Sequence, residues 1–185
     1  LNGQKVELAV GNGYARLARR WRTGDKLVLD LTSRGAADVD VTGAESFALS
    51  FGPGKDAFHG TGIAGGAAAK VALSIFGDDG DDTLQGGAGN DALHGGAGDD
   101  PFATAAAPDG ADLYDGGAGM DRLDYGARAG ALVVTMGANA DDGEVGENDD
   151  VGDSIEALVG GAGDDTLVGS AADNEIHGGA GKDTI

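Results

Sequence analysis

The chain of 185 residues carries a formal net charge of −20, contains no cysteine and has only 5% aromatic residues. This composition argues against a large globular core and excludes disulfide cross-links, and the acidic field repels nucleic acid and anionic membranes while attracting divalent cations. No run of 18 apolar residues occurs, so we expect no membrane insertion by this segment. Because the chain begins without methionine or a signal peptide, we expect it to be a piece of a longer protein.

Residues 1–34 read as short strands separated by turns, and they hold 7 of the 12 basic residues. Strands are expected at 6–10, 14–21 and 26–31. They predict a small antiparallel β segment, which we interpret as the end of an upstream β-domain. The stretch NGYARLARRWRTGDKLVLDL is similar to part of the carboxy-terminal β-domain of β-L-arabinofuranosidase-type glycoside hydrolases. That resemblance covers residues 1–33 and implies a catalytic domain before Leu1.

Residues 35–76 form the lead-in to a repeated region. The segment FGPGKDAFH, residues 51–59, places Gly54, Asp56 and Phe58 at spacings that recur further along the chain. Glycine and alanine make up most of residues 60–69, and a strand expected at 71–76 enters the first full repeat.

A nine-residue motif, Gly-Gly-x-Gly-x-Asp-x-U-x with U a large apolar residue, repeats through residues 77–124 and again through 160–185. The first block reads GDDGDDTLQ, GGAGNDALH, GGAGDDPFA, APDGADLYD and GGAGMDRLD, and the second block begins new copies at Gly160, Gly169 and Gly178. A fixed period of this kind indicates stacked structural repeats.

The residue type at each key position of the motif has a structural explanation. The glycines allow a tight loop whose carbonyls turn inward, and the x-U-x triplet forms a very short strand with its middle side chain on one face. One repeat cannot bury that side chain alone, so stacked repeats must build the core. The expected core residues are Leu84, Leu93, Phe102, Tyr114, Leu123, Leu167 and Ile176.

The sixth position carries the chemistry, because it is acidic in nearly every copy. Stacked strands lie about 4.8 Å apart and calcium–oxygen bonds are about 2.4 Å long, so a cation midway between two stacked loops reaches a carboxylate from each. Loop carbonyls complete the oxygen ligands that calcium prefers. The expected calcium-binding residues are Asp82, Asp91, Asp100, Asp112, Asp121, Asp165 and Asp183, together with the loop glycines Gly77, Gly86, Gly95, Gly116, Gly160 and Gly178.

These repeats resemble the RTX, or haemolysin-type, calcium-binding nonapeptide family. The resemblance implies an all-β fold, a parallel β-roll in which two nonapeptides make one coil and calcium is stacked between loops on the same edge. It pairs Asp82 with Asp100, Asp91 with Asp112, Asp100 with Asp121, and Asp165 with Asp183. Three features depart from the pattern: an insertion at 104–106 within the second pair, the uncharged Asn174, and Asp78 in place of a second glycine.

Residues 125–159 separate the two blocks. A strand is expected at 131–136. Ile155 and Leu158 are expected to rejoin the stack of apolar side chains formed by the repeats. Between them, DDGEVGENDDVGDSIE, residues 141–156, holds 8 acidic residues but lacks the acid-x-acid-x-acid-Gly spacing of an EF-hand loop. We interpret it as a mobile loop that attracts cations weakly, with a defined metal site as the alternative.

No enzyme motif accompanies the repeats. His59, His94 and His177 all occupy the ninth position, at a strand end where side chains point to solvent, and no His-Glu-x-x-His motif is present. The sequence therefore indicates a non-catalytic module that binds Ca²⁺. The RTX resemblance implies a secreted, extracellular protein that calcium folds after export through type I secretion machinery. The alternatives are the accessory tail of a secreted carbohydrate-active enzyme and part of an adhesive repeat array.

Overall fold

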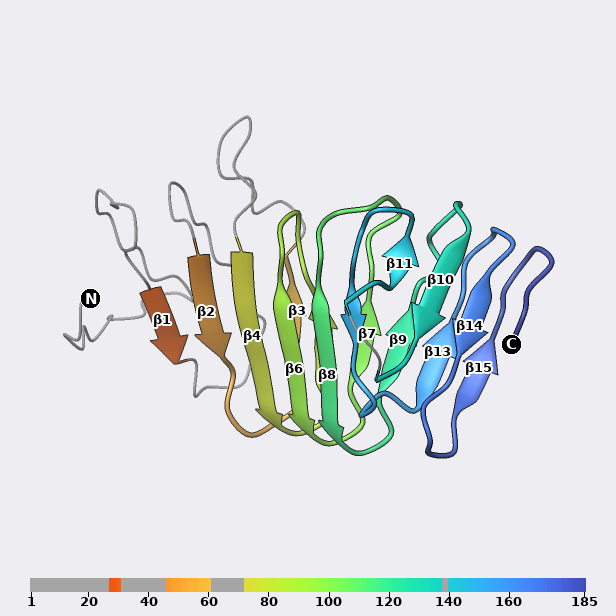
Figure 1. Ribbon diagram of the computed structural model, residues 1–185. Coiled ribbons are helices and arrows are strands. Elements are labelled where there is room, and N and C mark those ends of the chain that lie inside the picture. Colours follow the sequence, from red (N-terminus) through yellow and green to blue (C-terminus); the bar gives the residue numbers. More distant parts are fainter. Residues whose placement is uncertain (1–26, 31–45, 61–71, 138–139) are drawn as a thin grey trace.

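The computed structural model is built from short strands that wind into a row of flattened coils (Figure 1). It describes residues 27–30, 46–60, 72–137 and 140–185. Through most of the chain, successive strands alternate between two sheets whose strands run parallel, and β1 and β15 lie at opposite ends of the row. In the described residues the protein is all-β, which confirms the parallel β-roll expected from the repeats.

Two six-stranded sheets, A and B, form the two sides of the roll, and neighbouring strands within each are parallel. Sheet A runs in the order β1 (Leu27–Asp30), β2 (Ser46–Ser50), β4 (Ala72–Asp79), β6 (Ala92–Ala97), β8 (Leu113–Ala118) and β12 (Asp150–Val151). Sheet B runs in the order β3 (Ala57–His59), β5 (Thr83–Gln85), β7 (Pro101–Ala103), β9 (Arg122–Asp124), β13 (Ala157–Val159) and β15 (Glu175–His177). A third, small sheet has the order β11 (Gly143–Glu144), β10 (Leu132–Thr135) and β14 (Thr166–Val168).

The core is formed by inward side chains that the register stacks on one another. Sheet A stacks Leu49, Ile75, Leu93, Tyr114 and Val151. Sheet B stacks Phe58, Leu84, Phe102, Leu123, Leu158 and Ile176. Ile176 is partly buried and all the others are buried, as is Leu167 of the small sheet, so the expected apolar ladder is confirmed.

The strand at Leu27–Asp30 corrects one expectation, because it pairs parallel with β2 in the register Leu27↔Phe47. An antiparallel arrangement is therefore wrong for these residues. A strand in which apolar and polar residues alternate can pair either with the open edge of a parallel sheet or with a hairpin partner. The alternation does not distinguish these two arrangements. The strands expected at 6–10 and 14–21 lie outside the described residues.

Residues 125–159 depart from the sequential winding of the coils. β10 pairs parallel with β14, whereas β12, which follows β10 in the chain, pairs with the earlier strand β8. Along the chain, β10 therefore comes first but lies further along the roll than β12. β11, which is antiparallel to β10, leads the chain back to the position of β12. The carboxylate of Asp142 connects the two strands, since it accepts hydrogen bonds from Thr135 N (2.6 Å) and Val151 N (3.0 Å).

The prediction of a mobile loop at 141–156 is therefore wrong. Asp142, Glu147 and Asp149 are buried, and the segment contains both β11 and β12. Its acidic side chains accept hydrogen bonds from backbone N–H groups that lack a strand partner. The segment is therefore an ordered turn, although its composition is typical of a solvated loop.

Candidate metal sites

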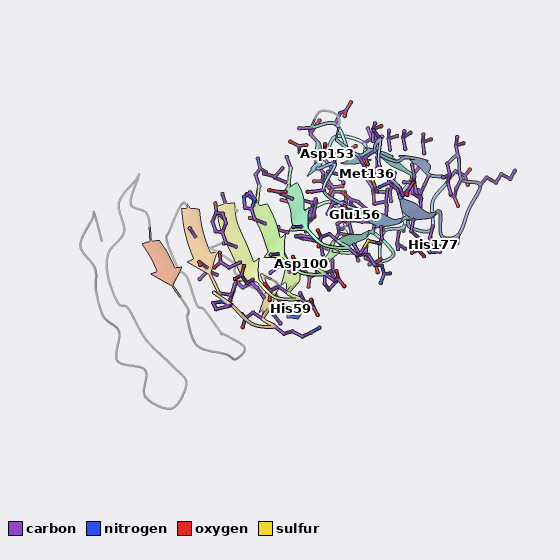
Figure 2. The ribbon with its side chains drawn as sticks, turned by 90° about the horizontal axis from the view of Figure 1, so that it is seen from below. His59, Asp100, Met136, Asp153, Glu156 and His177 are labelled. Carbon is purple, nitrogen blue, oxygen red and sulfur yellow. The ribbon has the colours of Figure 1, made fainter. Side chains whose placement is uncertain are left out.

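Two rows of loops connect the sheets, one along each long edge of the roll. We define the A-to-B edge as the loops that carry the chain from sheet A to sheet B; their sixth-position residues are Asp56, Asp82, Asp100, Asp121 and Glu156. The B-to-A edge is the opposite row of loops; it holds Asp91 and Asp112 of two loops that leave sheet B, Asp149 directly before β12, and Asp165 and Asp183 of the second block. Figure 2 shows Asp100 and Glu156 at different places along the roll, with Asp100 nearer His59 and Glu156 nearer His177.

The carboxylates of the A-to-B edge form a regular hydrogen-bonded ladder. The backbone N of Asp82 donates to Oδ1 of Asp100 (2.7 Å), and the N of Asp100 donates to Oδ1 of Asp121 (2.8 Å). The same contact joins Asp56 N to Asp82 Oδ1 (2.7 Å) and Asp121 N to Glu156 Oε2 (2.9 Å). One carboxylate oxygen per loop therefore fixes the preceding loop, and at Asp82, Asp100 and Asp121 the other oxygen is left for a ligand.

That second oxygen is buried without a partner at three successive positions. Oδ2 of Asp82, Asp100 and Asp121 has no hydrogen-bond partner among the described residues, and all three side chains are fully buried. Burial raises the pKa of Asp82 and of Asp121 to about 6, and the neighbouring Asp100 carboxylate adds to both shifts. A buried, unpaired carboxylate is costly unless a cation neutralises it.

The loop glycines leave room beside these oxygens. A Cβ atom on Gly95 would contact Asp100 Oδ2 and would lie 2.6 Å from the carbonyl oxygen of Gly116 in the next loop; Gly77 has the corresponding contacts with Asp82 Oδ2 and the Gly95 carbonyl. Gly98 has φ +141 and its missing Cβ would meet the Gly80 carbonyl, so it also needs to be glycine. Each loop thus places a carboxylate oxygen and a neighbouring carbonyl around one small space.

This donor set fits calcium. Calcium takes carboxylate and backbone carbonyl oxygens in flexible geometry, and both kinds of oxygen surround the space beside Gly77, Gly95 and Gly116. Within the described ranges no three His, Cys, Asp or Glu side chains converge as a metal-binding group. The repeats instead supply about one carboxylate per loop, so a cation here would be shared between loops and completed by carbonyls.

The B-to-A edge shows the same stacking, and the expected partners lie next to each other. Asp91 N donates to Asp112 Oδ1 (2.8 Å) and Asp165 N donates to Asp183 Oδ1 (3.0 Å). The insertion at 104–106 therefore leaves the Asp91–Asp112 contact intact. The ladder extends one step further, because Asp112 N donates to Asp149 Oδ1 (2.9 Å).

The second oxygens at four positions of this edge differ from those of the A-to-B edge, because protein donors satisfy them. Oδ2 of Asp91 accepts from Gly87 N (2.7 Å) and Oδ2 of Asp165 accepts from Gly161 N (2.9 Å). Two tyrosine hydroxyls do the same further along: Tyr114 OH donates to Asp112 Oδ2 (3.4 Å) and Tyr125 OH to Asp149 Oδ2 (2.8 Å). Burial raises the pKa of Asp112 to about 8 and that of Asp149 to about 7.

Sequence reasoning missed Asp149 and Glu156 as members of the ladders. Neither follows the glycine pattern, but each begins an acid-x-U triplet, Asp149-Asp150-Val151 and Glu156-Ala157-Leu158, whose apolar residue is buried. The same triplet at Asp56-Ala57-Phe58 completes the partial repeat at 51–59. The triplet is therefore a more general signal for a stacked loop than the glycines are.

The remaining departures from the repeat have local solutions. Asp78 adopts φ +76 in place of a glycine, and its carboxylate accepts from Ser50 Oγ (2.5 Å) and Gly52 N (3.0 Å) of the preceding coil. Asn174 donates through Nδ2 to the Ile155 carbonyl (3.3 Å). His59 and His177 are exposed as expected, whereas His94 is half-buried and stacks on Phe76 with ring centroids 4.8 Å apart.

A parallel roll with one carboxylate per loop stacked along its edges defines a class of metal-binding solenoid. The family model of the RTX calcium-binding nonapeptide repeat matches residues 74–100 and 148–185, in 4 copies. The chain therefore carries RTX calcium-binding repeats, and their ligand is Ca²⁺. No curated protein and no solved structure matches the chain. None of the described segments forms an apolar helix long enough to cross a membrane.

Proposed function

We propose that calcium ions bind between successive loops of the A-to-B edge, held by Asp82, Asp100 and Asp121 and by carbonyls of the loops opened by Gly77, Gly95 and Gly116. The observation that carries this proposal is the row of three fully buried Oδ2 atoms without a hydrogen-bond partner. Each faces a space that a single methyl group would fill.

The B-to-A edge is proposed as a second row of calcium sites. Its ligands would be Asp91, Asp112, Asp165 and Asp183, with carbonyls of the loops that begin at Gly86, Gly160 and Gly178. The support is again the space beside the first glycine: a Cβ on Gly160 would lie 2.6 Å from Asp165 Oδ2 and would contact the Gly178 carbonyl. Calcium entry at Asp91 and Asp165 would compete with the hydrogen bonds that close these loops.

Calcium binding of this kind also supports folding after export. RTX repeat proteins are typically exported, and extracellular calcium modules have dissociation constants of about 10⁻⁴ to 10⁻³ M. At cytosolic calcium such sites stay empty and the carboxylates repel one another, so we propose that the chain passes the type I secretion machinery loosely folded and winds its coils outside the cell. A sub-micromolar dissociation constant, measured by calorimetry, would contradict this.

Calcium counting by native mass spectrometry tests the proposed sites. Asp82→Ala should bind fewer ions than the wild-type chain, because it removes an oxygen from the buried row. Asp173→Ala is the matched control, since Asp173 is exposed and outside both ladders. Equal losses in the two variants would indicate diffuse attraction by the net charge of −20 instead of ordered sites.

A further inference from the structure

The loop at 127–132 occupies the place of a nonapeptide loop without carrying its sequence. Ala162 N donates to the carbonyl oxygen of Arg128 (2.9 Å), and Leu132 N donates to Asp165 Oδ1 (2.9 Å). These contacts are the ones that stacked repeats make elsewhere on the B-to-A edge. Arg128 therefore aligns with the second glycine, Gly161, and Leu132 aligns with the sixth-position aspartate.

The Arg128 side chain points away from the second block and into the junction with the first. Its Nη2 lies 2.5 Å from Glu147 Oε1 and 2.9 Å from Asp109 Oδ1, and its side chain is fully buried. The guanidinium carbon lies 5.9 Å from the centre of the Tyr125 ring, whose hydroxyl donates to Asp149. One cation thus contacts the loop before Asp112, the loop before Asp149 and the ring between them.

The surroundings keep this guanidinium charged. Burial by itself lowers the pKa of Arg128, but the Glu147, Asp109 and Asp149 carboxylates outweigh it and the pKa is raised. The neighbouring acids in turn have a positive charge that no metal supplies. Leu132 contributes no side-chain oxygen at the point where a regular repeat would contribute a carboxylate.

We infer that the Arg128 guanidinium takes the place of a calcium ion at the junction between the loop that ends at Asp149 and residues 127–132, so that this junction binds no calcium. The inference rests on the proposed calcium sites in the rest of the roll. A covalently attached cation cannot be removed by a chelator, so the junction between the two blocks keeps its charge balance when calcium is scarce.

The test compares two carboxylate-to-amide changes in the full chain, Glu147→Gln and Asp82→Asn, by counting bound ions in native mass spectrometry at saturating calcium. Because Arg128 already occupies Glu147, Glu147→Gln should keep the wild-type count, whereas Asp82→Asn should lose at least one ion. A lower count for Glu147→Gln would overturn the inference. An unchanged count for Asp82→Asn would instead contradict the proposed calcium sites, so the two failures are distinguishable.

Two further variants guard against misfolding. If Glu147→Gln gives no β signal by circular dichroism, the double variant Glu147→Gln/Arg128→Met removes both charges while keeping their size, and its ion count should again equal that of the wild type; a lower count overturns the inference. Arg128→Met alone should raise the calcium concentration for half-maximal folding at least threefold. Arg122→Met, which removes an exposed arginine paired with Asp124 (2.8 Å), should leave that midpoint unchanged. Equal midpoints for the two arginine variants would also overturn it.

Discussion

The two edges of the roll carry the same repeated motif, but the carboxylates on the two edges have different hydrogen-bond partners. On the A-to-B edge, Oδ2 of Asp82, Asp100 and Asp121 is buried without a partner. On the B-to-A edge, Gly87, Tyr114, Tyr125 and Gly161 donate to the corresponding oxygens. The difference shows that a consensus loop sets the position of a carboxylate, whereas the residues around it decide whether a cation is required to neutralise it.

Calcium removal should have the largest effect and should separate the two edges. At ten times the dissociation constant each site adds about 1.4 kcal/mol, so four sites add about 6 kcal/mol, comparable with the stability of a whole domain. In chelator we expect most β structure to be lost by circular dichroism. In a calcium titration followed by hydrogen exchange, the amides of Asp82, Asp100 and Asp121 should gain protection last.

A β signal that is unchanged in EDTA would contradict this expectation, and simultaneous protection of both edges would remove the distinction between them. Magnesium at the same concentration is the control, because its small octahedral shell accommodates shared loop carbonyls poorly.

Asp100→Ala should have the next largest effect, because Asp100 lies between Asp82 and Asp121 and would serve the sites on both sides. We expect the loss of two calcium ions and about 3 kcal/mol of calcium-dependent stability. Asp183→Ala should lose one ion, since the described part of the chain gives it one ladder neighbour, Asp165. Equal losses in native mass spectrometry would show that ions are not shared between successive loops.

Tyr125→Phe should convert part of the B-to-A edge toward the state of the other edge. It leaves Asp149 Oδ2 buried without its donor at 2.8 Å, and losing a hydrogen bond to a charged group costs about 2 kcal/mol. Tyr114→Phe removes a longer contact, 3.4 Å, and should cost less. Urea unfolding in calcium measures both; the reverse ranking would mean that the tyrosines act by packing alone.

The pH response of the metal-free chain should be the smallest effect and should differ between the edges. Burial raises the pKa of Asp82 and Asp121 to about 6, that of Asp149 to about 7 and that of Asp112 to about 8, from an ordinary value of 3.8. A raised folded-state pKa contributes stability that is complete below the ordinary value and is lost as the pH rises through the raised value. In chelator, order should therefore increase as the pH falls from 8 to 5.

Amide NMR spectra recorded in chelator at each pH can follow this response. On raising the pH, the A-to-B amides should lose dispersion first, near pH 6, and those around Asp112 and Asp149 at pH 7 to 8. Greater order at pH 8 than at pH 5 would contradict the sign of the effect.

The regular part of the molecule could be predicted from its sequence because its period fixes both spacing and environment. The stacking of Leu84, Leu93 and Phe102 and the contacts of Asp82 with Asp100 follow directly from that period. The junction could not be predicted, because its structure depends on contacts between residues that follow no repeat. Asp142 links β10 to β12, and Arg128 binds Glu147, 19 residues later.

The acidic segment 141–156 is the clearest case. Its 8 acidic residues give it the composition of a solvated loop, yet the chain buries Asp142, Glu147 and Asp149 against backbone N–H groups, a tyrosine hydroxyl and one arginine. Single-residue composition does not record which donors lie nearby. The acid-x-U triplets at Asp149 and Glu156 were the available signal, and they are visible only when the glycines are ignored.

The exchanged order of β10 and β12 has a consequence for the time course of folding. Coils of the first block can form one after another as the chain becomes available, since each strand pairs with one already present. β10 cannot do so, because its parallel partner β14 begins 31 residues after β10 ends, at Thr166 after Thr135. The roll therefore contains a closing step of high contact order, and refolding should show a fast phase for the first block followed by a slower phase that joins the two blocks.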